Sequence, residues 1–436
     1  MNHERRRFAR LSSLVLFLGL CLANARAAEH LVIISPHWEG MRFEFGRAFS
    51  DWHKARFGEA VEIDWRDLGG ASDDLKFVLS EFGQRHDGIG IDLFFGGGID
   101  PYYEFTKRGL IEAYRPSDKV LATIPPTVGG GPIYDPEFRW FGVALSSFGI
   151  LYNKRVLELN GWPVLDTWRD LAERAPMGSV GLGDPRNSGT MHMMYEVILQ
   201  RYGWDEGWRL ITLLAAKSRG FDRAATTTAK DVTTGNVVYG LAIDFYAFTQ
   251  IAAAGTDNLG FVLPSDCVVI NPDALAILRG APNRLVAQRF VEFAVSESGQ
   301  KLLVLPRGHP EGARDFSIER MSILPELYER YARVTLLPIN PFAQRTSFHY
   351  DAAKGAARCG ILNDLIGATL IDVYPELIAA AKHGDHPRYG GPIISETEAL
   401  RLAAGKWRDP LTRERTLIEW QRQAQQQYER LVAASE

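Results

Sequence analysis

The first hundred residues alternate between short apolar runs and stretches with helical spacing. Three runs rich in β-branched or aromatic residues predict buried strands: Leu31–Ser35, Val61–Trp65 and Ile89–Phe95. A loop follows each run, and apolar residues then recur at roughly helical intervals, as at Phe45, Phe49 and Trp52. Strand, loop and helix repeated in this order predict an open, mostly parallel α/β sheet.

Ligands of open α/β sheets gather outside the carboxyl ends of the strands. In this chain the loops at those ends contain small, polar and glycine residues. We therefore expect ligand-binding residues in these loops: Ser35, His37, Ser72, Asp73 and Gly97. The same residue types also cap helices and form turns, and His37 has the simpler explanation of an exposed loop histidine, so the pattern alone leaves both roles open.

A second series of elements begins after the segment Phe141–Lys154. This segment contains two short β-leaning runs, Val143–Leu145 and Ile150–Tyr152, which predict an extended stretch that changes direction or partner midway. Strands are then predicted at Val180–Leu182 and Gly240–Ile243, with helices between them. The chain therefore contains two α/β units joined by this segment.

The second unit contains its own candidate site residues. Asp184–Thr190 leads into a helix, and the free N–H groups at a helix start attract an anionic group. We select Ser188, Gly189 and Thr190, although a serine or threonine there often only caps the helix. Asp244 and Tyr246 follow the last strand and suit a cation, a hydroxyl or a sugar face. Arg223 is a weaker candidate for an anion, because a solvated arginine explains it more simply.

The N-terminus predicts export. Residues 1–27 combine an arginine-rich start, the short apolar run Leu14–Leu22 and an Ala-x-Ala cleavage site, as in a cleavable signal peptide. Removing their five arginines and one glutamate changes the net charge from −4 to −8. A mildly acidic chain without a transmembrane stretch argues against nucleic-acid or membrane partners, so we expect a soluble periplasmic protein. Whether Cys267 and Cys359 form a disulfide stays open.

Catalytic and metal-binding patterns are weak. The chain has no Gly-x-Ser-x-Gly elbow, no His-Glu-x-x-His and no paired Cys-x-x-Cys. His383 and His386 lie in a Gly/Pro-rich stretch without an obvious third ligand. We therefore expect no enzyme activity, no cofactor and no metal site.

The order of these parts resembles the type II periplasmic solute-binding proteins of ABC transporters, in the group that includes ferric iron, thiamine, polyamine and phosphosugar binders. The resemblance covers roughly residues 30–310. It is carried by five features in this order: Leu31–His37, Ile91–Phe95 with its glycines, Val143–Lys154, Asp184–Thr190 and Gly240–Tyr246. The resemblance implies a two-lobe α/β fold with crossing hinge strands, a small-molecule solute in the cleft, a membrane permease as partner, and a monomer.

By this likeness residues 28–145 and 250–322 form the first lobe, residues 146–249 the second, and residues 323–436 a mainly helical C-terminal region packed on the lobes. Ser147 then lies at the hinge, facing the cleft, and Asp244–Tyr246 lies beside it. The C-terminal region is longer than the resemblance explains.

Two departures bear on the ligand. Ferric binders of this group carry two adjacent tyrosines where this chain has Phe245–Tyr246, and a glutamate where it has Gly96–Gly98. Bare ferric binding is therefore disfavoured and kept as the alternative. Helix N-termini favour an anionic ligand, whereas Asp73, Asp184 and Asp244 favour an amine or a polyol. An exported enzyme and a sensor or adaptor of the same fold are the remaining alternatives.

Overall fold

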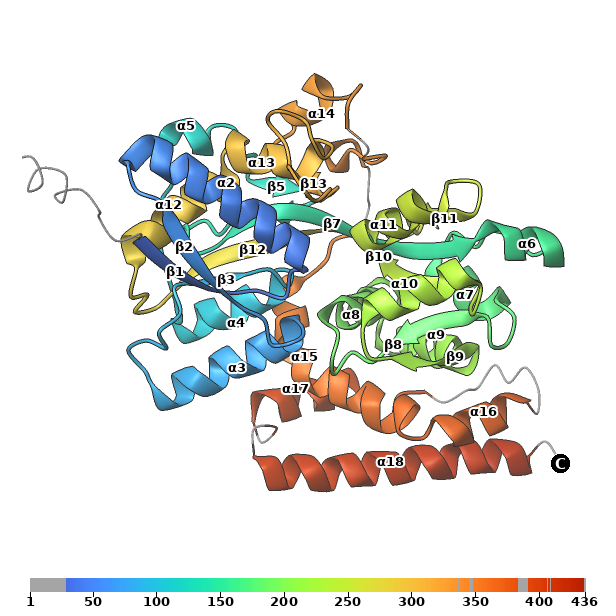
Figure 1. Ribbon diagram of the computed structural model, residues 1–436. Coiled ribbons are helices and arrows are strands. Elements are labelled where there is room, and N and C mark those ends of the chain that lie inside the picture. The colour runs from blue at the N-terminus through green and yellow to red at the C-terminus, as the bar shows by residue number, and fades with distance from the viewer. Residues whose placement is uncertain are drawn as a thin grey trace, which may run out of the picture.

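One long strand, β7 (Phe141–Asn153), runs through both halves of the molecule (Figure 1). Its first half pairs antiparallel with β12 (Ile270–Leu278), and its second half pairs antiparallel with β10 (Tyr239–Ile243). The partner changes between Ser147, which faces Ile270, and Phe148, which faces Ile243. The predicted change of partner is therefore confirmed, and the strand itself is continuous.

The computed structural model describes residues 29–335, 337–344, 348–382, 391–405, 407 and 409–434. The predicted signal peptide, residues 1–27, and the pair His383 and His386 lie outside the described residues.

The first lobe is a sheet in the order β2-β1-β3-β12-β7, in which β1, β2 and β3 are parallel. Its elements are β1 (Glu29–Ile34), α2 (Glu39–Phe57), β2 (Val61–Arg66), α3 (Ala71–Gln84), β3 (Leu93–Phe95), α4 (Asp100–Arg108), β4 (Ile111–Glu112), α5 (Asp118–Leu121), β5 (Thr127–Val128), β6 (Gly131–Pro132), α12 (Arg284–Val295), α13 (Glu297–Val304), β13 (Met321–Ser322), α14 (Glu326–Arg330) and a 3₁₀ turn (Pro341–Ala343). The predicted strand over 89–95 is shorter than expected, because Ile89 and Ile91 enter the apolar core without joining the ladder.

The second lobe continues from β7 in the order β10-β8-β9. Its elements are α6 (Lys154–Asn160), α7 (Trp168–Arg174), β8 (Val180–Gly183), α8 (Gly189–Tyr202), α9 (Trp204–Ala216), β9 (Ser218–Asp222), α10 (Ala225–Thr234), α11 (Asp244–Ala254) and β11 (Leu259–Val262). We draw the end of this lobe after Val262 rather than at residue 249, because residue 249 lies inside α11 and β11 pairs with the second half of β7.

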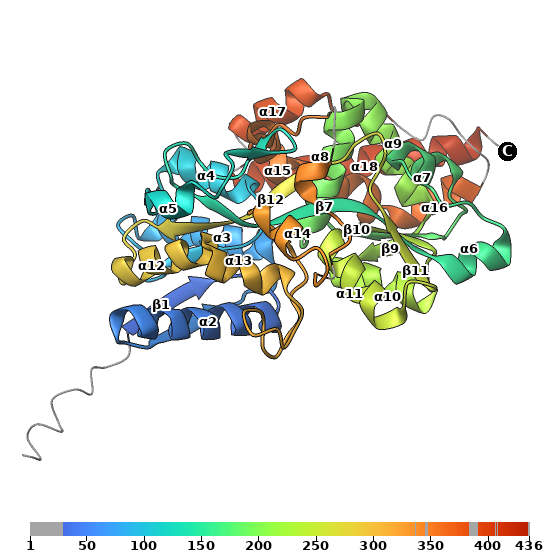
Figure 2. The ribbon, with the colours of Figure 1, turned by 90° about the horizontal axis from the view of Figure 1, so that it is seen from above.

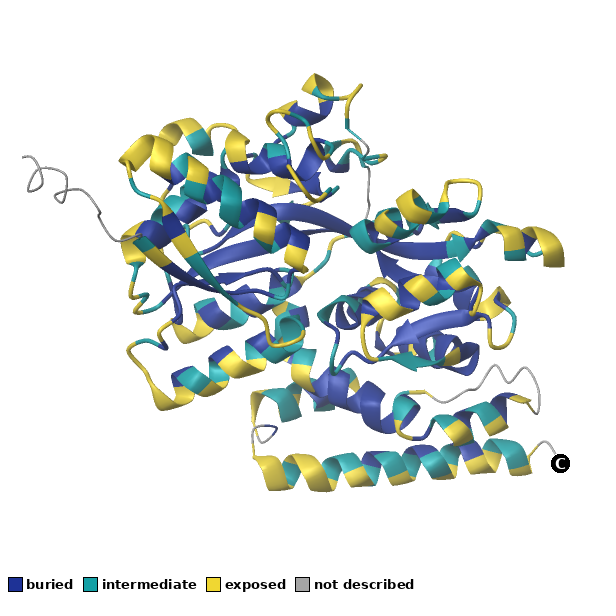
Figure 3. Ribbon diagram, in the orientation of Figure 1, coloured by how far each residue is buried: buried dark blue, intermediate teal, exposed yellow. Residues whose placement is uncertain are grey.

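The C-terminal region is helical and lies along the second lobe (Figures 1 and 2). It begins at residue 352 rather than at 323, because Leu327 and Tyr328 of α14 are buried in the core of the first lobe. It consists of α15 (Ala352–Ile366), a π-helical turn (Gly367–Ile371), α16 (Tyr374–Lys382), α17 (Glu396–Ala404) and α18 (Pro410–Ala433). One side of α18 faces solvent, whereas α15 is largely buried (Figure 3). No helix among the described residues is long and apolar enough to cross a membrane.

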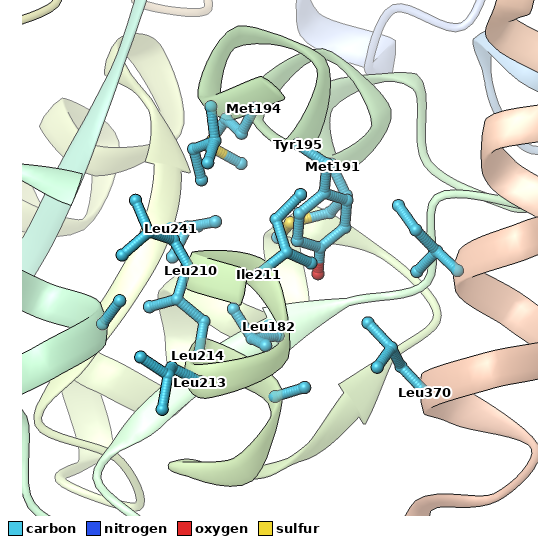
Figure 4. Packing of buried hydrophobic residues seen from close by; sticks show 14 of the residues in the cluster. Leu182, Met191, Met194, Tyr195, Leu210, Ile211, Leu213, Leu214, Leu241 and Leu370 are labelled. Atoms are coloured by element: carbon cyan, nitrogen blue, oxygen red, sulfur yellow. The ribbon is translucent and has the colours of Figure 1, made fainter. Parts of the chain in front are cut away.

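Apolar cores fill each lobe. In the first lobe α2, α12 and α13 cover one face of the sheet, and α3 and α4 cover the other. In the second lobe Leu182, Met191 and Ile211 pack together, and Leu370 of the C-terminal region enters the same cluster (Figure 4). Burying a side chain such as Leu370 stabilises the fold by about 1.5–3 kcal/mol. The C-terminal helices are therefore part of the second lobe's core. Cys267 and Cys359 are both free thiols.

Candidate functional site

A cavity of about 730 Å³ lies between the lobes. Its walls come from the loops after β1, β2 and β3 on one side, the loops after β8, β9 and β10 on the other, and the helices α15 and α17. Parallel strands align their carboxyl ends, so the loops that follow them meet at one edge of each sheet. Joining the two sheets through β7 turns both edges toward the same cleft.

Three of the helices whose first residues line this cavity are α3, α8 and α10. The first backbone bonds run from Asp73 N–H to Gly70 C=O in α3 (3.0 Å), from His192 N–H to Ser188 C=O in α8 (3.0 Å) and from Thr227 N–H to Ala224 C=O in α10 (3.0 Å). The N–H groups of the first two residues of each helix come before these bonds and have no acceptor in the helix. Those residues line the cavity: Ala71, Ser72, Gly189, Thr190, Ala225 and Thr226. Together with the helix dipoles they make the cleft attractive to an anion.

The glycine turn after β3 brings the backbone close to the start of α3. Gly96, Gly97 and Gly98 have φ values of +115°, +90° and +75°, a region that side chains rarely adopt. A Cβ atom on Gly97 would lie 2.9 Å from the Cβ of Ala71, so only glycine fits there. Gly97 and Gly98 both line the cavity.

The floor of the cleft holds a buried charged network. His37 Nε2 lies 2.8 Å from Asp273 Oδ2, and its Nδ1 lies 2.9 Å from Ser35 Oγ. Arg320 also donates to Asp273 from one terminal nitrogen, and to Ser146 Oγ at 2.8 Å from the other. Burial would raise the pKa of Asp273, but Arg320 and His37 hold that pKa well below its usual range. Burial lowers the pKa of His37 against the opposing pull of Asp273, which favours the neutral ring.

Arg320 links the two lobes at this floor. It comes from the loop before β13 in the first lobe, and its guanidinium carbon lies 4.2 Å from the centre of the Phe245 ring in the second. Only 3% of Arg320 is exposed, and its Nε has no hydrogen-bond partner among the described residues.

Seven of the predicted residues line the cavity. They are His37, Ser72, Gly97, Ser188, Gly189, Thr190 and Tyr246. Ser188 also caps α8, because its Oγ accepts from Met191 N–H at 3.3 Å. The N–H groups of Gly189 and Thr190 thus remain for a ligand, while the serine hydroxyl holds the helix start in place.

Four predicted residues are not on the cavity wall, each for a local reason. Ser35 lies behind His37 and positions its ring. Ser147 points away because strand residues alternate, so its neighbours Ser146 and Phe148 line the cavity instead. Asp73 is not among the residues that line the cavity, and its Oδ1 lies 3.4 Å from Lys76 Nζ in an i,i+3 ion pair. We no longer expect direct ligand contact from these residues.

Asp244 is the fourth of these residues, and both of its carboxylate oxygens already accept hydrogen bonds at the hinge. Its Oδ2 accepts from the N–H of Ser147 at 3.0 Å and from its hydroxyl at 3.2 Å, and its Oδ1 accepts from Phe245 N–H at 2.7 Å. Burial raises the pKa of Asp244 to about 6, although Arg320 and these hydrogen bonds oppose the rise. The carboxylate fastens β7 to the start of α11.

The three aspartates that argued for an amine ligand are all neutralised or turned away. Asp184 binds Arg186 at 2.8 Å, Asp73 faces Lys76 at 3.4 Å, and Asp244 is held at the hinge. Arg223, in contrast, lines the cavity, is exposed, and forms no ion pair with any described residue. The electrostatics of the cleft therefore favour an anionic group.

Sequence reasoning missed Arg320 and Asp273. Asp273 stands in the middle of the buried strand β12, and an isolated charge in an apolar strand is a usable signal of a buried pair. Arg320 gives no such signal, because it lies in a loop and meets Asp273 only through the fold.

The lobes touch at the rim of the cleft. Lys76 Nζ of the first lobe donates to Arg186 C=O of the second at 3.1 Å. The starts of α3 and α8 also lie close together. A Cβ atom added to Gly70 would lie 3.2 Å from the carbonyl oxygen of Asn187. The structure therefore has the two lobes in contact over the cavity.

Comparison with known proteins identifies the fold's relatives. Residues 89–319, just over half of the chain, match the family model for bacterial extracellular solute-binding proteins. The phosphoglycerate transport regulatory protein PgtC of Salmonella typhimurium is 28% identical over 162 residues, which are 37% of this chain. That stretch spans only 40% of the length of PgtC.

Two solved structures share the fold. The periplasmic binding protein AfuA from Actinobacillus pleuropneumoniae, with fructose-6-phosphate bound, has a TM-score of 0.60 and 19% identity, and covers 80% of this chain and 100% of its own. Iron-bound HitA from Pseudomonas aeruginosa has a TM-score of 0.58 and 18% identity, and covers 78% of this chain and 99% of its own. The predicted two-lobe periplasmic-binding-protein fold is confirmed, and this chain belongs to the bacterial extracellular solute-binding protein family.

Proposed function

We propose that this protein is a periplasmic receptor that captures a small phosphorylated organic solute between its lobes and delivers it to an ABC transporter permease. The observation that carries this proposal is the convergence on one cavity of three helix starts, those of α3, α8 and α10, with Arg223, which forms no ion pair with any described residue. A phosphate group accepts several hydrogen bonds at once and needs positive potential, and the cleft offers both. PgtC is named for phosphoglycerate transport, and AfuA was solved with fructose-6-phosphate bound.

Family membership and the N-terminus support the delivery, location and assembly that we propose. Residues 1–27 have the pattern of a cleavable signal peptide, and solute-binding proteins of this family act outside the cytoplasm. We expect a monomer that presents its closed form to a permease. The name of PgtC supports a second role, in which the closed form instead reports the solute to a membrane sensor.

Ferric iron is the second candidate solute, because HitA was solved with iron and because His37 and Tyr246 both line the cavity. Against it, His37 Nε2 is already engaged by Asp273 at 2.8 Å. Among the described residues, no group of three or more His, Cys, Asp or Glu side chains is arranged to hold a metal.

A binding screen tests the function. Native mass spectrometry of the freshly purified mature chain reports any co-purified solute, and a thermal-shift panel then compares sugar phosphates, phosphoglycerates, phosphonates, polyamines and ferric salts. A true ligand at a hundredfold excess over its Kd stabilises the folded state by about 3 kcal/mol. We expect phosphorylated solutes to raise Tm and polyamines to leave it unchanged. A rise with ferric salts alone would favour the iron candidate, and turnover of a substrate would contradict a receptor.

The helix start of α8 provides the first mutational prediction. Ser188→Asp keeps a good N-cap residue but adds a negative charge where the phosphate is expected, so affinity for the phosphorylated ligand should fall about tenfold or more. Ser395→Asp is the matched control, because Ser395 caps α17 in the same way, accepting from Glu398 N–H at 3.2 Å, and does not line the cavity. Equal affinity of the two variants, measured by calorimetry, would remove α8 from the site.

A further inference from the structure

The C-terminal helices give the cleft a third wall. Residues of α15 and α17 line the cavity beside α4 and α8, and most are small: Ala356, Ala357, Gly360, Ala403 and Ala404. The related structures cover nearly all of their own chains but only about 80% of this one, so about a fifth of this chain has no counterpart in them. The family model matches residues 89–319, so α15 and α17 lie outside the matched part of the chain.

The helix α15 also joins the lobes. Its first residue, Ala352, is buried in the core of the first lobe, whereas Ile361 and Leu365 are buried in the core of the second. Just before it, the Tyr350 hydroxyl donates to Asp100 Oδ2 of α4 at 2.8 Å. The wall therefore contacts both lobes at once.

Two buried acceptors on α4 and α8, beside this wall, lack hydrogen-bond partners among the described residues. His192 of α8 is only 4% exposed, and its Nδ1 lies 2.7 Å from Asn363 Oδ1 of α15. The amide oxygen accepts, so Nδ1 carries the proton and Nε2 presents a lone pair. Nε2 has no hydrogen-bond partner among the described residues, and neither has Asp100 Oδ1. His192 Nε2 lies 3.9 Å from Asp100 Oδ2, the other oxygen of that carboxyl group, and both residues line the cavity. Buried polar atoms rarely stay unpaired, so these two call for a bound group.

We propose that Asp100 and His192, held in place by Tyr350 and Asn363 of the C-terminal region, form a second recognition subsite that binds a hydroxyl group on the carbon chain of the solute. This inference rests on the proposed function, since it assigns the end of the solute that lies away from the phosphate.

The chemistry of the pair selects a hydroxyl over a charged group. A carboxylate or second phosphate would meet two acceptors and would be repelled by Asp100. Burial raises the pKa of Asp100 to about 7, so an ammonium group would not find a fully ionised partner at neutral pH. Burial lowers the pKa of His192, which keeps the ring neutral and Nε2 an acceptor. A hydroxyl donates to Nε2 and also accepts from Asp100 whenever that carboxyl is protonated.

Calorimetry with three probes tests the subsite. The probes are inorganic phosphate, a phosphorylated polyol, and an alkyl phosphate of equal length without hydroxyls. The variant His192→Phe keeps an aromatic ring and removes the lone pair. We expect it to lose about tenfold in affinity for the phosphorylated polyol and to bind the other two probes as the wild type does. Asp100→Asn, nearly the same size, is the second variant, and should reduce the same preference if His192→Phe does not fold.

His53→Phe is the control, because His53 is a fully buried histidine outside the cavity. It should leave the preference for the hydroxylated probe unchanged even if it lowers Tm. Equal losses for all three probes, or no loss at all, would overturn the subsite. If the wild type binds none of the probes, the proposed function fails, and the subsite fails with it.

Discussion

At the scale of single residues, the floor of the cleft shows how a buried charge is tolerated. Arg320 and Asp273 are 3% and 7% exposed and are paired, with His37 and Ser146 satisfying further atoms. A buried pair gains little over an apolar replacement, but removing one partner strands the other charge. The arginine has a positional role instead, because its guanidinium packs on the ring of Phe245 and so joins the two lobes.

A double-mutant cycle tests this network. Arg320→Met should reduce the free energy of unfolding by about 3 kcal/mol, because Asp273 stays buried without its partner. Adding Asp273→Asn to the same chain should recover much of that loss. Urea unfolding at pH 7 measures both. A loss below about 1 kcal/mol in the single variant would mean that water reaches Asp273 and that the pair is not buried in solution.

At the scale of secondary-structure elements, the cleft is an arrangement of helix starts. The helices α3, α8 and α10 each follow a strand whose carboxyl end faces the cavity, so their N-termini converge without any special sequence motif. The starts of α3 and α8 come from different lobes and touch through Gly70 and Asn187. Closure of the lobes thus depends on a missing side chain at Gly70.

Substitution at Gly70 should separate closure from folding. Gly70 has an extended backbone (φ 167°), so Gly70→Asn is tolerated and supplies a good N-cap for α3. The added side chain meets the Asn187 carbonyl only when the lobes close, and we expect ligand affinity to fall at least about tenfold with little change in the Tm of the ligand-free protein.

Gly83→Asn is the control for this substitution, because Gly83 lies in the same helix and a Cβ there would meet no atom within 4 Å. Calorimetry and thermal unfolding compare the two variants. Equal affinities would show that the lobes need not approach as closely as in this structure.

At the scale of the whole molecule, the C-terminal region is a structural part of the second lobe. Leu370 packs into the core around Met191 and Ile211, and Arg358 pairs with the fully buried Glu196. The same region reaches the first lobe through Tyr350. The C-terminal region of the same chain therefore forms one wall of the cleft.

Hydrogen exchange tests this integration. Leu370→Ala should cost about 2–5 kcal/mol and accelerate exchange in α8 and α9 together with α16, since all share one core. Leu411→Ala on α18 is the control, because that leucine is 65% exposed. Faster exchange confined to residues 352–434 would instead identify the C-terminal region as a separate folding unit.

Much of this molecule could be predicted from local patterns. The three strand–loop–helix units, the crossing segment and the glycine turn at residues 96–98 all follow from periodicity and turn chemistry, which depend on neighbours a few residues apart. The same locality explains why Ser188, Gly189 and Thr190 were found: strand ends and helix starts mark the cleft wherever the lobes meet.

What only the tertiary structure decided depends on contacts between distant parts of the chain. Ser147 and Asp73 are suitable ligands by residue type, but strand alternation turns Ser147 away from the cavity and Lys76 pairs with Asp73. Arg320 reached Asp273, and Tyr350 reached Asp100 across 250 residues, through packing that no local pattern encodes. The sequence thus determined which elements form and where a cleft lies. The tertiary structure decided which side chains point into that cleft, because long-range packing sets the orientation of each element.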